Sequence, residues 1–102
     1  MKPIYVDIDG TISNHQSMQG WKTHGINQSV LSKVKRLITE GKEIVIWSGS
    51  TQYATAFCKE FGINPVASIG KPSFLVDNEI DLLLSRLKKN IMSPNDFIKR
   101  DF

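Results

Sequence analysis

The chain has 102 residues, of which 40% are hydrophobic and 23% are charged, and its formal net charge is +3. These values are typical of one soluble globular domain over residues 1–102, and they leave no room for a second one. The mild positive charge suits an anionic substrate but is too weak to predict nucleic-acid binding by itself. The single cysteine excludes an internal disulfide framework, and no apolar run is long enough to cross a membrane. We therefore expect a cytoplasmic protein that has no membrane partner.

The first predicted element is a strand over residues 4–8, an apolar run without a period of two, as expected for a strand covered on both faces. Its end carries the sequence Asp7-Ile8-Asp9-Gly10-Thr11. Two carboxylates two residues apart on a strand point to the same side, and they repel unless a cation or a proton lies between them. A plain Asp-Gly turn is the structural alternative. The close pair indicates a reactive site.

Residues 12–27 form a polar stretch without periodicity, which predicts a flap, either a long loop or a β-hairpin. His15 and His24 lie in it without acidic neighbours, so solvated loop positions are favoured over metal ligands. Trp21 either covers the site or anchors the flap on the core, and the anchor is the favoured interpretation.

The next βαβ unit begins with a helix that Asn27 or Ser29 can cap and that Gly41 can end. Its apolar positions repeat with helical spacing at Val30, Leu31, Val34, Leu37 and Ile38. A buried strand follows over residues 44–47. Directly after it come small polar residues, Ser48, Gly49 and Ser50.

A second helix starts near Thr51, with Ser50 or Thr51 as its cap, and Gly62 stops it. Residues 66–69 form a weaker candidate strand, and Lys71 follows, held between a glycine and a proline.

The last strand candidate is the apolar run of residues 74–76, after which come Asp77, Asn78 and Asp81. A third helix carries the apolar stripe Ile80, Leu83, Leu84 and Leu87. Ser93-Pro94 is a helix cap followed by a proline at the first helical position, so it predicts a short last helix.

Strands that alternate with helices predict βαβ units joined by right-handed crossovers. We therefore expect a small, doubly wound, Rossmann-like α/β fold, a three-layer sandwich around a parallel sheet of at least four strands, without a cap domain. In open sheets of this kind the site lies beyond the carboxyl ends of the strands. The polar residues that follow each strand should then share one chemistry.

The residues at the strand ends do share a chemistry. Carboxylates are the hard oxygen ligands that Mg²⁺ prefers, and no Cys/His cluster competes for a softer metal. Hydroxyls, open backbone amides and a lysine suit a phosphate, which predicts binding by Thr11, Ser48, Gly49 and Lys71. For Ser48 the structural alternative is a helix-cap role, and for Lys71 it is an ordinary surface lysine.

The order of these motifs resembles the haloacid dehalogenase superfamily of aspartate-nucleophile phosphotransferases. The resemblance rests on Asp-x-Asp-Gly-Thr, then a hydroxyl after an apolar strand, then a lysine, then Asp-x-x-x-Asp, and it covers roughly residues 4–85. The first motif is highly specific, whereas the serine and the lysine gain their weight from order and placement.

The resemblance implies a role for each matching residue. Asp7 would be the nucleophile and Asp9 the general acid and base. Mg²⁺ would bind the Asp7 carboxylate, the main-chain carbonyl of Asp9, and Asp77. Many relatives have two adjacent acids in the last motif, whereas here Asn78 follows Asp77, so either Asn78 or Asp81 could complete the metal shell. Asp81 could equally be an acid that the helix dipole favours in a first turn.

We therefore predict Mg²⁺-dependent hydrolysis of a phosphate monoester through an aspartyl-phosphate. An open site fits a large or exposed substrate such as a polynucleotide end, whereas a small nucleotide or sugar phosphate fits if a second subunit closes the site. Nucleic acid enters only as a potential substrate. The alternative is a non-catalytic domain of the same fold that binds phosphate or Mg²⁺ and regulates a partner.

Overall fold

The computed structural model describes residues 2–102. Its elements in chain order are β1 (Ile4–Asp7), a wide turn η1 (Ile8–Ile12), α1 (Trp21–His24), α2 (Gln28–Thr39), β2 (Ile44–Ser48), α3 (Thr51–Phe61), β3 (Ala67–Gly70), α4 (Ile80–Asn90) and α5 (Pro94–Lys99). The alternation of strands and helices predicted from the sequence is confirmed over residues 4–70.

The three strands form one parallel sheet in the order β1-β2-β3. Asp7 pairs with Trp47, and Ser48 pairs with Gly70, so the carboxyl ends of all three strands lie at one edge. Helix α2 connects β1 to β2 and α3 connects β2 to β3, which makes two Rossmann-like βαβ units.

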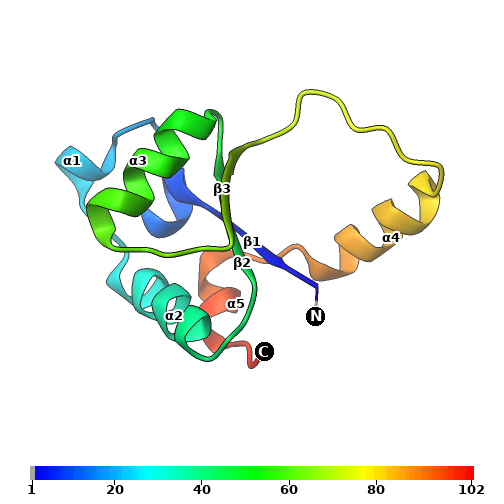
Figure 1. Ribbon diagram of the computed structural model, residues 1–102. Helices are drawn as coiled ribbons and strands as arrows, with labels where there is room; N and C mark the ends of the chain where they lie inside the picture. The colour runs from blue at the N-terminus through cyan, green and yellow to red at the C-terminus, as the bar shows by residue number, and fades with distance from the viewer. Residues whose placement is uncertain (1) are drawn as a thin grey trace.

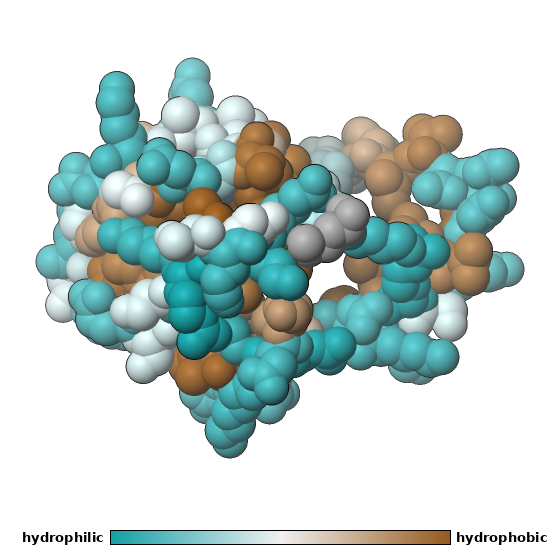
Figure 2. Space-filling model, turned by 60° about the horizontal axis from the view of Figure 1, so that its bottom comes forward, coloured by the Kyte–Doolittle hydropathy of each residue, from teal (hydrophilic) through white to brown (hydrophobic). Residues whose placement is uncertain are grey.

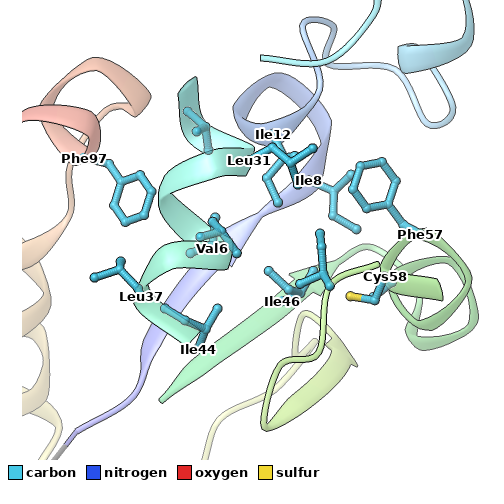
Figure 3. Close-up of a cluster of buried hydrophobic side chains, with 14 residues drawn as sticks. Val6, Ile8, Ile12, Leu31, Leu37, Ile44, Ile46, Phe57, Cys58 and Phe97 are labelled. Carbon is cyan, nitrogen blue, oxygen red and sulfur yellow. The ribbon is translucent and has the colours of Figure 1, made fainter. Parts of the chain in front are cut away.

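One face of the sheet carries the hydrophobic core. Val6, Ile44 and Ile46 project from this face and are buried against apolar side chains of α2, α3 and α5 (Figure 3). Consistent with this, α2, α3 and α5 lie on the same side of the sheet in Figure 1. The core therefore forms between the sheet and one layer of helices.

The opposite face, called the outer face below, carries Tyr5, Val45, Trp47, Ala67 and Ile69, and none of these belongs to the core cluster. Tyr5 is 47% exposed, and its ring lies edge-on against Trp47 with 4.9 Å between centroids. Helix α4 is the element on this side of the sheet, and it stands apart from the sheet (Figure 1).

The prediction of at least four strands in a three-layer sandwich is not met within this chain. The weaker candidate became β3, whereas residues 74–76 form no strand, and Phe74 and Val76 are 92% and 97% exposed. A strand needs a neighbour to bond its backbone groups, and residues 74–76 lie in a segment that leaves the sheet. The structure therefore has three strands and one packed helical layer.

The helix ends follow the capping residues of the sequence. Asn27 accepts a hydrogen bond from the Val30 amide at the start of α2, and Ser50 accepts one from the Tyr53 amide at the start of α3. Gly62 ends α3 in the left-handed conformation with φ +65°, which costs glycine little because it has no Cβ.

The molecule has two regions, because the chain leaves the packed part of the fold after β3 and later returns to it. We call residues 71–91 the arm and the remaining described residues the body. The arm runs from Lys71 through an extended segment into α4, and the chain then returns to the body at α5 (Figure 1). In the space-filling view an opening separates the arm from the body (Figure 2).

A buried lysine holds the returning chain on the body. Lys33 of α2 donates hydrogen bonds to the carbonyl oxygens of Ile98, at 3.0 Å, and Arg100. Its ammonium also lies over the rings of Phe97 and Phe102, at 5.2 and 5.3 Å from their centroids. Desolvation lowers the pKa of Lys33, and nearby Arg36 lowers it further. The lysine thus ties residues 97–102 to α2.

Within residues 2–102, no helix combines the length and the apolar character needed to span a bilayer.

Candidate active site at the strand ends

The turn that follows β1 sets the geometry of the site. In η1 the backbone departs from helical angles at Asp9 and Gly10, and Gly10 has φ +80°. A side chain at Gly10 would be strained by this φ and would also crowd Gln16, since an added Cβ would lie 3.2 Å from its Cγ. The glycine therefore allows the sharp turn that keeps Asp7 and Asp9 at one edge of the sheet.

Asp7 is the centre of the contacts at this edge. Its Oδ1 lies 3.2 Å from the Lys71 ammonium, and its Oδ2 accepts a hydrogen bond from the Thr11 hydroxyl at 3.4 Å. The Asp7 and Lys71 side chains are both partly exposed, so the ion pair contributes only about 0–1 kcal/mol to stability. Lys71 therefore offsets the negative charge of Asp7 at this edge.

Asp9 is held by a side chain from a distant part of the sequence. The Tyr53 hydroxyl, on the first turn of α3, donates a hydrogen bond to Asp9 Oδ1 at 2.9 Å and accepts one from the Gln19 amide at 3.1 Å. Desolvation raises the pKa of Asp9, and the neighbouring charge of Asp7 raises it further, against the opposing effects of Tyr53 and Lys71. A raised pKa favours a carboxyl that can carry a proton.

Ser48 is fully buried at the end of β2, and its hydroxyl has no hydrogen-bond partner among the described residues. An unsatisfied buried hydroxyl costs about 1–3 kcal/mol, which is unusual in a folded protein. Gly49 follows, and a Cβ added there would meet nothing within 4 Å, so this stretch of backbone is open to an approaching group. Both features fit the phosphate-binding role predicted for Ser48 and Gly49.

Lys71 is placed by the backbone that follows β3. Its amide donates to the Ser48 carbonyl at 2.6 Å, and its ammonium also lies 5.6 Å from the centre of the Trp47 ring. The structure therefore brings together residues from the ends of all three strands, as the sequence predicted. These are Asp7, Asp9, Thr11, Ser48, Gly49 and Lys71.

Asp77 and Asp81 lie in the arm and are not brought to this edge. Asp77 accepts a hydrogen bond from the Glu79 amide at 2.7 Å and lines a small pocket of the arm together with Leu82, Leu83 and Arg86. Asp81 is exposed in the first turn of α4. Among residues 2–102, no three acidic, histidine or cysteine side chains are grouped closely enough to hold a metal ion.

The fit of this edge to Mg²⁺ can be judged from its donors. Mg²⁺ prefers an octahedral shell of oxygen ligands. Asp7 and the carbonyl of Asp9 are of the right type, but Lys71 already neutralises Asp7, and Asp77 is not grouped with them. These residues do not by themselves form a magnesium site in the arrangement described.

The flap of residues 12–27 is closed by an antiparallel bridge between Ser13 and Ile26. Trp21 packs against Phe57 and Phe61 of α3, with ring centroids 6.1 and 4.9 Å away, so it anchors the flap. The rings of His15 and His24 stack on each other at 4.1 Å, a contact that their nine-residue separation did not predict.

Tyr53 is the site residue that sequence reasoning missed, because its spacing placed it on the apolar stripe of α3. A signal was present. The first turn of a helix that follows a strand lies at the edge where the site is built, and Tyr53 is three residues after the cap, Ser50.

Comparisons with protein-family models, with curated proteins and with solved structures give no match.

Proposed function

We propose that this chain is a phosphatase of the haloacid dehalogenase type, which hydrolyses a phosphate monoester through an aspartyl-phosphate. The observation that carries the proposal is Asp7, bonded by Lys71 and Thr11 at the carboxyl end of β1, with Asp9 two residues further on. Nucleophile, charge compensation and a proton carrier then lie at one edge of the sheet.

In the first step a carboxylate oxygen of Asp7 attacks the phosphorus, and the bond from phosphorus to the ester oxygen breaks. Asp9 gives its proton to the departing oxygen, so that an alcohol leaves. The raised pKa of Asp9 supports this role because it increases the protonated fraction near neutral pH.

In the second step water attacks the phosphorus of the aspartyl-phosphate. Asp9, now a carboxylate, accepts a proton from this water, and the Asp7 carboxylate is released together with inorganic phosphate. Lys71 lies where it can bind a phosphoryl oxygen, and the unpartnered hydroxyl of Ser48 can donate to another.

Mg²⁺, if bound at this edge, would supply positive charge that lets an anionic carboxylate approach a phosphate dianion. The Asp7 carboxylate and the Asp9 carbonyl would be two of its ligands, and Asp77 is the candidate from the resemblance for a third. The substrate class remains a phosphate monoester on a nucleotide, a sugar or a polynucleotide end.

The test is phosphate release from p-nitrophenyl phosphate and from a panel of phosphate monoesters, with Mg²⁺ and with EDTA. We expect Asp7→Asn to lower kcat by at least about a thousandfold, since it removes the nucleophile. Asp96→Asn, an exposed acid on α5, is the matched control and should leave turnover unchanged.

A single turnover in ¹⁸O-water identifies the atom attacked, because water that attacks phosphorus puts the label into phosphate and leaves Asp7 unlabelled. If the wild type releases no phosphate from any ester with Mg²⁺ present, the phosphatase proposal is wrong. Phosphate or Mg²⁺ binding without turnover would then favour the regulatory domain.

A further inference from the structure

Two apolar surfaces of this chain have no partner within the described residues. One is the outer face of the sheet, where Val45 is buried but Tyr5 is exposed, together with the free edge of β1, which pairs with β2 alone. The other is the arm, where Phe74, Leu75 and Val76 are 92%, 67% and 97% exposed. Along α4, exposed apolar residues recur with helical spacing at Ile80, Leu84 and Leu87.

Residues 74–76 have the composition of a strand, and β1 has the free edge of a sheet. Aromatic and β-branched residues favour strands, and an exposed edge strand offers unpaired backbone groups to any matching segment. If residues 74–76 paired in parallel with β1, Asp77 would lie level with Asp7 when Phe74 lies level with Ile4. The two predicted metal ligands would then be neighbours.

The chain cannot make this pairing within itself while β3 keeps its place. In the observed register Ile4 is level with Val66 of the chain segment that leads into β3. A strand beside β1 would therefore place Phe74 three strand spacings from β3 across the sheet. Along the strand direction, Phe74 would lie four residues from Gly70, toward the amino end of the strands. With strands about 4.8 Å apart and about 3.3 Å per residue, that separation is roughly 19 Å. The four residues from Gly70 to Phe74 span at most about 14 Å, even when fully extended.

We propose that two copies of this chain exchange their arms. Residues 74–76 of each copy pair with the free edge of β1 in the other copy and complete a four-stranded sheet there. The exchanged arm would bring Asp77 of one copy close to Asp7 and Asp9 of the other. The role of Asp77 in such a shared site rests on the proposed function.

The structure favours a second copy of this chain as the partner of these two surfaces. Every chain carries each surface once, so in a pair of chains the arm of each copy can cover the β1 edge of the other. Exchange of an identical element between two copies is a low-cost route to a dimer, because both sides of each contact are encoded in the same chain. A stable interface needs roughly 800 Å² from each partner. An exposed aromatic residue alone contributes about 150–250 Å², and the arm carries seven more large exposed apolar residues (Leu75, Val76, Ile80, Leu82, Leu84, Leu87 and Ile91).

Arm exchange also accounts for the incomplete metal site. Asp7 and Asp9 lie in the body and Asp77 lies in the arm, and within the described residues no third acidic group joins the first two. In the exchanged dimer each site takes Asp7 and Asp9 from one copy and Asp77 from the other. Each site then has the oxygen ligands that Mg²⁺ prefers.

The first test is independent of activity. In the proposed register Tyr5 of one copy lies beside Leu75 of the other, at a strand spacing that a disulfide can bridge. Tyr5→Cys and Leu75→Cys chains, unfolded together, refolded and oxidised, should give a disulfide-linked dimer that contains one chain of each kind. The control pair, Tyr5→Cys with Ser85→Cys, should give little of it because Ser85 lies on the opposite side of α4 from the apolar stripe.

Light scattering of the wild type, refolded at high protein concentration, should give twice the mass of the chain. A monomer at all concentrations, without the mixed disulfide, would overturn the inference even if the protein were an active phosphatase. A double variant with both cysteines that forms the disulfide within a monomer would also overturn it.

The second test asks whether sites are shared. Asp7→Asn and Asp77→Asn chains should each have little activity when refolded alone. Refolded together, they should recover roughly a quarter of wild-type turnover, because half of the dimers are mixed and one of their two sites is intact. Sites built within one chain would recover none, since every site would then carry one defect.

The two proposals can fail separately. A mixed disulfide and a dimer without any phosphatase activity would leave the arm exchange standing and remove the proposed function. An active monomer would leave the proposed function standing and remove the arm exchange.

Discussion

The body and the arm of this chain contain similar shares of hydrophobic residues but differ in how these residues are used. In the body, α2 and α3 bury their apolar stripes against one face of the sheet, and α5 adds Phe97 to the same core. In the arm, α4 has an equally amphipathic sequence, yet none of its residues is buried. Each large apolar side chain left in water forgoes about 1.5–3 kcal/mol.

The difference shows that a stripe of apolar residues specifies a helix but does not specify its partner. Helices α2 and α3 are each connected on both sides to strands of the sheet, so the crossover fixes where they pack. Helix α4 follows a nine-residue segment that forms no strand, so nothing local fixes its position.

The largest expected contrast between the two regions is in thiol reactivity. Cys58 is buried in the body, and desolvation raises its pKa to about 11. A cysteine introduced by Ser85→Cys on α4 is exposed, so at pH 8 it should react with a disulfide reagent at least about 100-fold faster than Cys58. Stopped-flow labelling with and without urea measures both rates. Equal rates in the native protein would mean that the body opens as readily as the arm.

A smaller effect is expected at the buried lysine. Lys33→Met removes the donor for two carbonyl groups of residues 97–102 and should lower the free energy of unfolding by about 1–3 kcal/mol. The exposed neighbour variant Lys35→Met should change it by less than about 0.5 kcal/mol. Urea unfolding followed by tryptophan fluorescence gives both values. Identical unfolding of the two variants would mean that Lys33 does not hold the C-terminal segment.

The pH dependence of this contribution has a definite sign. The pKa of Lys33 is lower in the folded protein than its ordinary value of about 10.4, so between the two values the unfolded chain binds more protons. The stability difference between wild type and Lys33→Met should therefore increase as the pH rises through this alkaline window. A difference that fell with pH would contradict a desolvated ammonium.

The smallest effect concerns the hydrogen bond that holds Asp9. Tyr53→Phe should lower kcat/KM about tenfold for alkyl phosphates, whose departing oxygen needs the proton of Asp9, a loss that corresponds to one hydrogen bond. The kcat/KM of p-nitrophenyl phosphate should change little because its leaving group departs without protonation. Tyr5→Phe is the control. A uniform loss over both substrates would indicate general disorder at the site.

Much of the body could be predicted from its sequence. The strands, the caps Asn27 and Ser50, the stop at Gly62 and the cluster around Asp7 all depend on local patterns, and the structure contains them. The anchoring of the flap by Trp21 was also the favoured interpretation, and the contacts with Phe57 and Phe61 confirm it.

Other features could not be predicted because they depend on contacts between distant segments. Tyr53 reaches Asp9 across 44 residues, and Lys33 reaches the last carbonyls of the chain across 65 and 67 residues. The run of residues 74–76 has the composition of a strand but lacks a reachable edge. Strand composition does not reveal whether an edge is within reach.

The return of the chain to α2, secured by Lys33, has a kinetic consequence. The arm is fixed at both ends and is therefore a closed loop, so two folded monomers would have to loosen their body contacts before their arms could change places. We expect the protein concentration during folding to decide the share of dimers, and later dilution to alter that share only slowly. Two preparations of the same sequence could then differ in assembly, according to how each was folded.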